Sequence, residues 1–189
     1  PGELVAATHP SYREAPPVRR IRGHVVVGLQ EALRARGHFE RYRDRLTAIG
    51  RSDLLEVSPT EWLAVEHVVV NDSALRSLEL DDWELRELGL AIADRSYGVV
   101  LSTLMRLSAH VGLDVSRMLQ QFPRVHPKLL DGGGQGVFRV SPRVVRWEMW
   151  NHPLAGSPVN RTVTRGSVLS TFQKLNPSTT VSEAGVTDD

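Results

Sequence analysis

The apolar pattern over residues 78–119 constrains the fold of this chain more than any other feature. Leu85, Leu88 and Ile92 recur at helical spacing, and a second series extends the pattern. That series consists of Tyr97, Val100, Leu101, Leu104, Leu107 and Val111. Spacings of three and four residues place side chains on one face of an α-helix. The pattern predicts a central amphipathic helix, with a bend at Gly98, around which the other elements pack.

The composition fits one domain without disulfides. The chain has 189 residues, the size of a single domain, and it has no cysteine. The lack of cysteine excludes disulfides and metal sites built from thiolates. No segment approaches the run of about 18 apolar residues that a membrane-spanning helix needs, and the first residues do not resemble a signal peptide. We therefore expect a cytoplasmic protein with no membrane partner.

Charge alternates in blocks along the chain. Residues 1–50 hold 9 Arg and 5 acidic residues, a net charge of +4, and residues 51–96 hold 4 Arg and 11 acidic residues, a net charge of −7. Residues 97–165 hold 9 basic and 3 acidic residues, a net charge of +6, and the remainder contributes −2. The overall charge of +1 gives no general attraction to nucleic acid. The blocks favour complementary surfaces within one molecule or between two copies, unless they are simply solvated helix faces.

The first quarter of the chain predicts an arm followed by two helices. Residues 1–20 contain Pro10, Pro16 and Pro17 with scattered polar residues, which is typical of an extended arm. Amphipathic patterns then cover residues 24–36 and 39–49. Gly37 and Gly50 follow these patterns directly, and glycine is the residue that most often ends a helix. We therefore expect two short helices in succession.

Two capping boxes predict further helix starts. Ser58-Pro59-Thr60-Glu61 has the N-cap, the first-turn proline and the acidic third residue of a helix start. We expect this helix to be interrupted at Asn71-Asp72. Asp81-Asp82-Trp83-Glu84 predicts a second box at the start of the central helix. A short helix over residues 114–122 should end at Pro123.

The glycine-rich run over residues 131–136 separates helical patterns from strand patterns. After it, residues 137–140 and 143–150 have the composition and alternation of two strands, with a turn at Ser141-Pro142. A further amphipathic helix covers residues 159–175, and residues 176–189 have the composition of a flexible tail. The sequence therefore predicts an α+β fold in one domain over residues 21–175. Its helical layer (21–130) packs on a small C-terminal antiparallel sheet.

None of the residue patterns indicates a reaction. The seven histidines are scattered without metal-binding spacing, and His110 and His126, at the ends of predicted helices, are the candidates for a role beyond structure. The glycine run lacks the Lys-Ser/Thr of a phosphate-binding loop and precedes a strand, so we interpret it as a linker or bulged turn. No Gly-x-Ser-x-Gly elbow is present. We predict no enzymatic activity, no cofactor and no metal.

Aromatic and basic residues alternate in the second predicted strand. Trp147 and Trp150 with Arg143 and Arg146 have the composition of a stacking platform for single-stranded nucleic acid. A half-buried strand explains Trp147 more simply, because alternate residues of such a strand face the core. We favour the strand and predict that the chain binds no nucleic acid.

The order of several segments resembles that of a known family. These segments are Arg22–Val27, Ser58–Trp62, Glu87–Asp94 and Pro153-Leu154. Over residues 18–175 the chain resembles a family of myxobacterial proteins of about this length. That family is similar in layout to the haem-nitric-oxide-binding and vinyl-reductase-type ligand-binding superfamily.

This resemblance implies an α+β domain, often dimeric, with an apolar pocket between a helical layer and a small sheet. The cofactor motifs of the superfamily are missing from this chain. The haem branch uses Tyr-x-Ser-x-Arg, and the zinc-bearing phenol sensors use cysteines; neither is present. His126 lies roughly where the resemblance would place a proximal haem ligand. Because the Tyr-x-Ser-x-Arg motif is missing, we predict that the protein binds no haem.

Two functional hypotheses follow. The first is a non-enzymatic signalling or protein-interaction module, most simply a homodimer. The alternative is a receptor for an apolar small molecule bound between the helical layer and the sheet. A pocket of a few hundred Å³ would favour the receptor, and a large exposed apolar patch would favour the module. The candidate pocket or interface residues are Trp83, Leu90, Tyr97, Met105 and Trp147.

Overall fold

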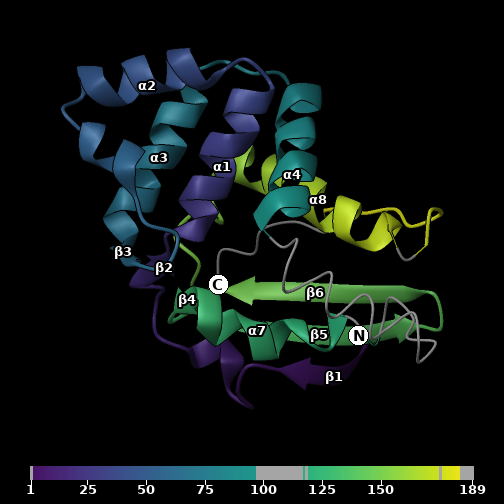
Figure 1. Cartoon of the computed structure of the whole chain (residues 1–189). Helices are drawn as coiled ribbons and strands as arrows, with labels where there is room; N and C mark the ends of the chain where they lie inside the picture. Colours follow the sequence, from purple (N-terminus) through teal and green to yellow (C-terminus); the bar gives the residue numbers. More distant parts are fainter. Residues whose placement is uncertain (1, 97–116, 118, 175, 184–189) are drawn as a thin grey trace.

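The computed structural model describes residues 2–96, 117, 119–174 and 176–183 and has an α+β fold (Figure 1). The α-helices with described bounds are α1 (His24–Ala35), α2 (Phe39–Ala48), α3 (Val65–Arg76), α4 (Asp82–Ser96), α7 (Phe122–Leu129) and α8 (Pro158–Gln173). One antiparallel sheet has the order β1 (Glu3–Ala7), β5 (Gly134–Ser141), β6 (Val144–Trp150). A second has the order β3 (Trp62–Ala64), β2 (Arg20–Arg22), β4 (Leu130–Asp131). Short 3₁₀ helices cover Tyr12–Glu14 and Ser52–Glu56.

The helices α1–α4 gather on one side of the molecule, and the strands β1, β5 and β6 lie on the other (Figure 1). Helix α8 runs beside α4 above β6, and α7 lies with the strands. The expected class is therefore confirmed. No helix in the described ranges is both long and apolar enough to cross a membrane.

Several elements form where the sequence predicts them. Gly37 and Gly50 follow the ends of α1 and α2, and their φ angles of 76° and 70° are left-handed and favour glycine. Asp81 and Glu84 form the predicted capping box, in which each side chain accepts a hydrogen bond from the other residue's backbone N–H (2.8 and 2.9 Å). The hairpin β5–β6 and helix α8 also lie close to their predicted bounds.

Strands occur earlier in the chain than the sequence suggests. Strand β1 lies within the residues expected to form an extended arm, and it is an edge strand paired with β5. Strands β2 and β3 also precede Leu130, so the prediction of an entirely helical first part was wrong. These strands have only three to five residues, too few for their alternation to stand out from a helical pattern.

Three local predictions were also wrong. Ser58–Glu61 forms a turn that leads into β3, although Glu61 still accepts a hydrogen bond from the Ser58 N–H (2.8 Å). Asn71 and Asp72 lie inside the continuous helix α3, where both are buried. Pro123 lies in the first turn of α7 instead of ending a helix. The bend at Gly98 and most of the helix expected over 114–122 lie outside the described residues.

The glycine run forms part of the packed structure and is not a linker. Gly132 and Gly133 have φ angles of 97° and 69°, which turn the chain from β4 into β5. Gly136, within β5, lies against the ring of Tyr12, and an added Cβ would come within 2.8 Å of the tyrosine Oη. Gly134 similarly lies against the Tyr12 backbone. The run therefore provides a turn followed by a surface without side chains on which Tyr12 packs.

Candidate functional site

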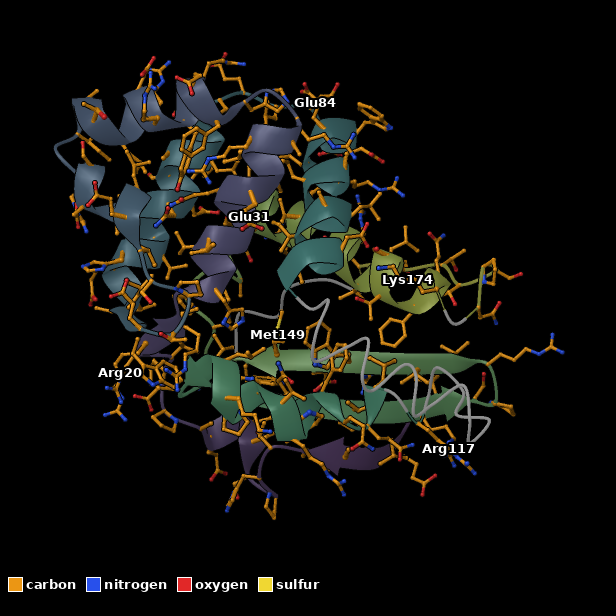
Figure 2. All side chains as sticks on the ribbon, viewed as in Figure 1. Arg20, Glu31, Glu84, Arg117, Met149 and Lys174 are labelled. Carbon is orange, nitrogen blue, oxygen red and sulfur yellow. The ribbon has the colours of Figure 1, made fainter. Side chains whose placement is uncertain are left out.

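A cavity of about 360 Å³ lies between the helices and the hairpin sheet. Its described wall comes from α1, α3, α4 and α8 on the helical side and from α7, β5, β6 and the loop after β6 on the other, and Ile21 of β2 and Leu130 of β4 also contribute. Met149 of β6, which contributes to the wall, is labelled in Figure 2 on the side of the strand that faces the helices. The volume falls in the range of natural small-molecule sites.

Most of the cavity wall is apolar. Leu29, Val68, Ile92 and Val163 project from four different helices. On the sheet side, Trp147 packs edge-to-face against Phe122 of α7, with ring centroids 5.4 Å apart. Apolar side chains form no hydrogen bonds with water, so this wall can enclose an apolar ligand.

Asp72 and Ser157 form the polar contact between α3 and α8. The Ser157 hydroxyl donates to Asp72 Oδ1 (2.9 Å) and accepts the Asn160 N–H (3.2 Å), which caps α8. Burial raises the pKa of Asp72, against the hydrogen bond from Ser157 and the charge of Arg76. Asp72 is the one carboxyl group among the described lining residues, which include no lysine or arginine. The Ser157 hydroxyl has a structural role, so it does not indicate a nucleophile.

Burial lowers the pKa of the three histidines of the cavity wall, His24, His126 and His152, so their neutral forms predominate at pH 7. Burial, with a smaller contribution from nearby His126, lowers the pKa of His152 to about 4. Burial also lowers the pKa of His126, while backbone hydrogen bonds to Gly132 and Gly133 oppose this effect. The Leu154 N–H donates to His152 Nδ1 (3.3 Å), which leaves the hydrogen of the neutral ring on Nε2.

Three buried polar atoms of lining residues have no hydrogen-bond partner among the described residues. They are His126 Nδ1, Gln135 Oε1 and Trp147 Nε1. His126 and Gln135 are each 6% exposed. Buried polar groups in folded proteins are almost always paired, so atoms of this kind indicate where a bound molecule or water would be held.

The structure separates the five candidate residues named from the sequence. Trp147 lies in the cavity wall. Trp83 is 64% exposed on α4, and Leu90 is partly buried on the same helix. Tyr97 and Met105 lie outside the described residues, as does His110. The five therefore do not form one described site.

Sequence reasoning missed most of the polar residues of the cavity. His126 was a candidate because of its place near a helix end, but Gln135, His152 and Asp72 had no distinguishing pattern. Asp72 was interpreted as a helix interruption, although the polar pair Asn71-Asp72 between apolar residues of one helix was a usable signal.

The described residues include no group of three or more His, Cys, Asp or Glu side chains arranged to hold a metal ion. The absence of metal and haem from this protein remains a prediction.

Comparisons of the chain with family models, with curated proteins and with solved structures find no match.

Proposed function

We propose that this protein is a non-enzymatic receptor that binds a small, mainly apolar molecule in the cavity between its helices and its hairpin sheet. The observation that carries the proposal is the cavity of about 360 Å³ with a largely apolar wall. The resemblance described above implies a pocket in the same position. Residues from distant parts of the chain form the wall, so an occupant would contact both layers and stabilise their packing.

A pair of neighbouring valines on α3 provides a matched test. Val68 is 6% exposed and lines the cavity, whereas Val69 is 45% exposed. Val68→Phe should fill part of the cavity and abolish binding of methylcyclohexane, measured by ligand-detected NMR. Val69→Phe should bind the hydrocarbon as the native protein does.

Native mass spectrometry of the purified protein complements this test. We expect a mass above that of the chain alone, which organic solvent removes. If the native protein retains no molecule and shows no binding of methylcyclohexane, the receptor function is wrong. Equal binding by Val68→Phe and the native protein would show that the hydrocarbon occupies a different site.

A second candidate is a signalling or interaction module that forms a homodimer. The specific observation is the 64% exposure of Trp83 on α4, because aromatic residues often anchor interfaces. Leu90 lies two helical turns further along the same helix. The charge blocks of −7 and +6 would orient two copies.

Sedimentation velocity over a wide concentration range tests this second candidate. The native chain should be a dimer, and Trp83→Asp should give a folded monomer. Ile49→Asp, at a residue 56% exposed after α2, should leave the dimer intact. A native protein that remains monomeric throughout would contradict the dimeric module.

A further inference from the structure

The polar atoms without partners lie at the β5 end of the cavity. In the β5–β6 pair, Gln135 is opposite Met149 and Val137 is opposite Trp147, so Gln135 and Trp147 are diagonal neighbours on one face of the sheet. His126 Nε2 lies 2.9 Å from the oxygen of Gly132, just before β5. A Cβ added at Gly133 would lie 3.6 Å from the His126 ring. The three side chains thus follow one another along the start of β5, with His126 beside the residues before the strand and Gln135 between it and Trp147.

The hydrogen-bonding character of each atom follows from its contacts. The Gly132 oxygen can only accept, so His126 must donate from Nε2, and Nδ1 of the neutral ring is then an acceptor. Gln135 Oε1 is an acceptor, and Trp147 Nε1 is a donor. This end of the cavity therefore presents two acceptors and one donor that no described residue satisfies.

The charge of the wall restricts the ligand further. The described lining residues include no lysine or arginine, so a carboxylate would be desolvated without a cation to balance it. Asp72, the described carboxyl group, is bonded to Ser157 at the contact of α3 with α8 and not to the β5 end. An ammonium group would thus lack a carboxylate beside His126 and Gln135.

We infer that the ligand of this cavity is an apolar molecule ending in an uncharged carboxamide-type group held by His126, Gln135 and Trp147. A primary amide matches the set, because its two N–H hydrogens complement the two acceptors and its carbonyl oxygen complements the indole N–H. The apolar remainder of the ligand lies against the valine and leucine side chains of the helices. This assignment rests on the receptor function proposed above and names the class of molecule received.

Four probes with one ring skeleton test the assignment on the full chain. They are cyclohexanecarboxamide, cyclohexanecarboxylate, aminomethylcyclohexane and methylcyclohexane. Calorimetric titration at neutral pH should rank the amide first, at least about tenfold tighter than each of the others, the value of roughly one net hydrogen bond. A carboxylate, amine or hydrocarbon that binds as tightly as the amide overturns the assignment.

Two variants locate the amide. Gln135→Leu removes an acceptor, and Trp147→Phe removes the donor while keeping an aromatic ring. Each should weaken amide binding by about tenfold and change the affinity for methylcyclohexane by much less. Gln173→Leu, at an exposed glutamine of α8, is the matched control and should change neither affinity.

Gln135→Leu also has a readout without ligand. It replaces a buried acceptor that lacks a partner by an apolar group, so the unliganded variant should melt at a higher temperature than the native protein.

The probes distinguish a failure of the amide assignment from a failure of the receptor function. If methylcyclohexane binds and the amide binds no better, the amide assignment alone is wrong. If none of the probes binds, the receptor function and the assignment are both wrong.

Discussion

The hydroxyl of Ser167 on α8 donates a hydrogen bond of 2.8 Å to the backbone oxygen of Gly89 on α4. The two helices approach closely at this point because glycine lies on both sides. A Cβ at Gly89 would lie 3.0 Å from the Cα of Gly166 and would collide with the Val163 oxygen. Gly166 in turn lies against the backbone of Arg86. This contact fixes α8, which carries Val163, Ser167 and Thr171 of the cavity wall.

Gly89→Ala should therefore destabilise the protein by about 1–3 kcal/mol, the usual effect of overpacking, although alanine favours a helix by about 1 kcal/mol. Urea unfolding followed by circular dichroism measures the difference. Gly156→Ala is the control, since nothing lies within 4 Å of its added Cβ. Equal or greater stability of Gly89→Ala would show that α4 and α8 can move apart without a loss of stability.

Glu148 is the centre of a polar cluster on the face of the hairpin sheet away from the cavity. Its carboxylate accepts hydrogen bonds from Tyr12 (2.7 Å), Arg13 (3.1 Å) and Trp150 (3.2 Å). Burial opposes its ionisation, but these hydrogen bonds outweigh burial and lower the pKa of Glu148. The cluster joins the N-terminal segment to β6.

Glu148→Gln should lower the free energy of unfolding by about 1–3 kcal/mol, because a neutral amide accepts hydrogen bonds from these donors more weakly than a carboxylate does. The lowered pKa means that this contribution is present above the ordinary glutamate pKa and is lost as pH falls through the folded value. Chemical denaturation at neutral and acidic pH should therefore show a smaller deficit in acid. Glu3→Gln, at a carboxylate whose side chain is 73% exposed, should leave the free energy of unfolding nearly unchanged at both pH values.

The elements that could be predicted are those fixed by local chemistry. The glycines after α1 and α2 act through their own backbone conformation, and the Asp81–Glu84 box acts over one turn. Helix α8 was recognisable from its periodicity. Each of these signals lies within a few residues of the structure that it specifies.

The features that were missed depend on distant partners. Ser58–Glu61 keeps half of its capping pattern, but the pairing of β3 with β2 draws the following residues into a strand. Gly136 has its role only because Tyr12, far away in sequence, packs on it. The cavity also depends on distant partners, since its lining residues come from nine of the described helices and strands, and no local pattern specifies which side chains face one another.

The capping box of α4 allows a direct stability test. Asp81 Oδ1 accepts the Glu84 N–H at 2.8 Å. Asp81→Ala should reduce stability by about 1 kcal/mol, the usual value of a helix N-cap. The neighbouring Asp82→Ala leaves the hydrogen bonds between Asp81 and Glu84 intact and should reduce stability by less. Thermal unfolding of both variants compares them, and a larger loss in Asp82→Ala would contradict the assignment of the cap.

The histidines of the cavity wall predict that stability falls in acid. The pKa of His152 is lowered from an ordinary value of 6.5 to about 4 by burial and by nearby His126. Between these values the unfolded chain binds a proton that the folded chain does not. The stabilising contribution is therefore present above pH 6.5 and is lost as pH falls through about 4. The shift corresponds to on the order of 3 kcal/mol.

His152→Phe should flatten this dependence, because a phenyl ring keeps the apolar packing and takes up no proton. Urea unfolding at several pH values between 6.5 and 4 should give a shallower slope for the variant than for the native protein. Some slope should remain, since burial also lowers the pKa of His126 and of His24. His9→Phe, at an exposed histidine, should keep the native slope. Identical slopes for His152→Phe and the native chain would mean that His152 reaches solvent and takes up its proton without opening the cavity wall.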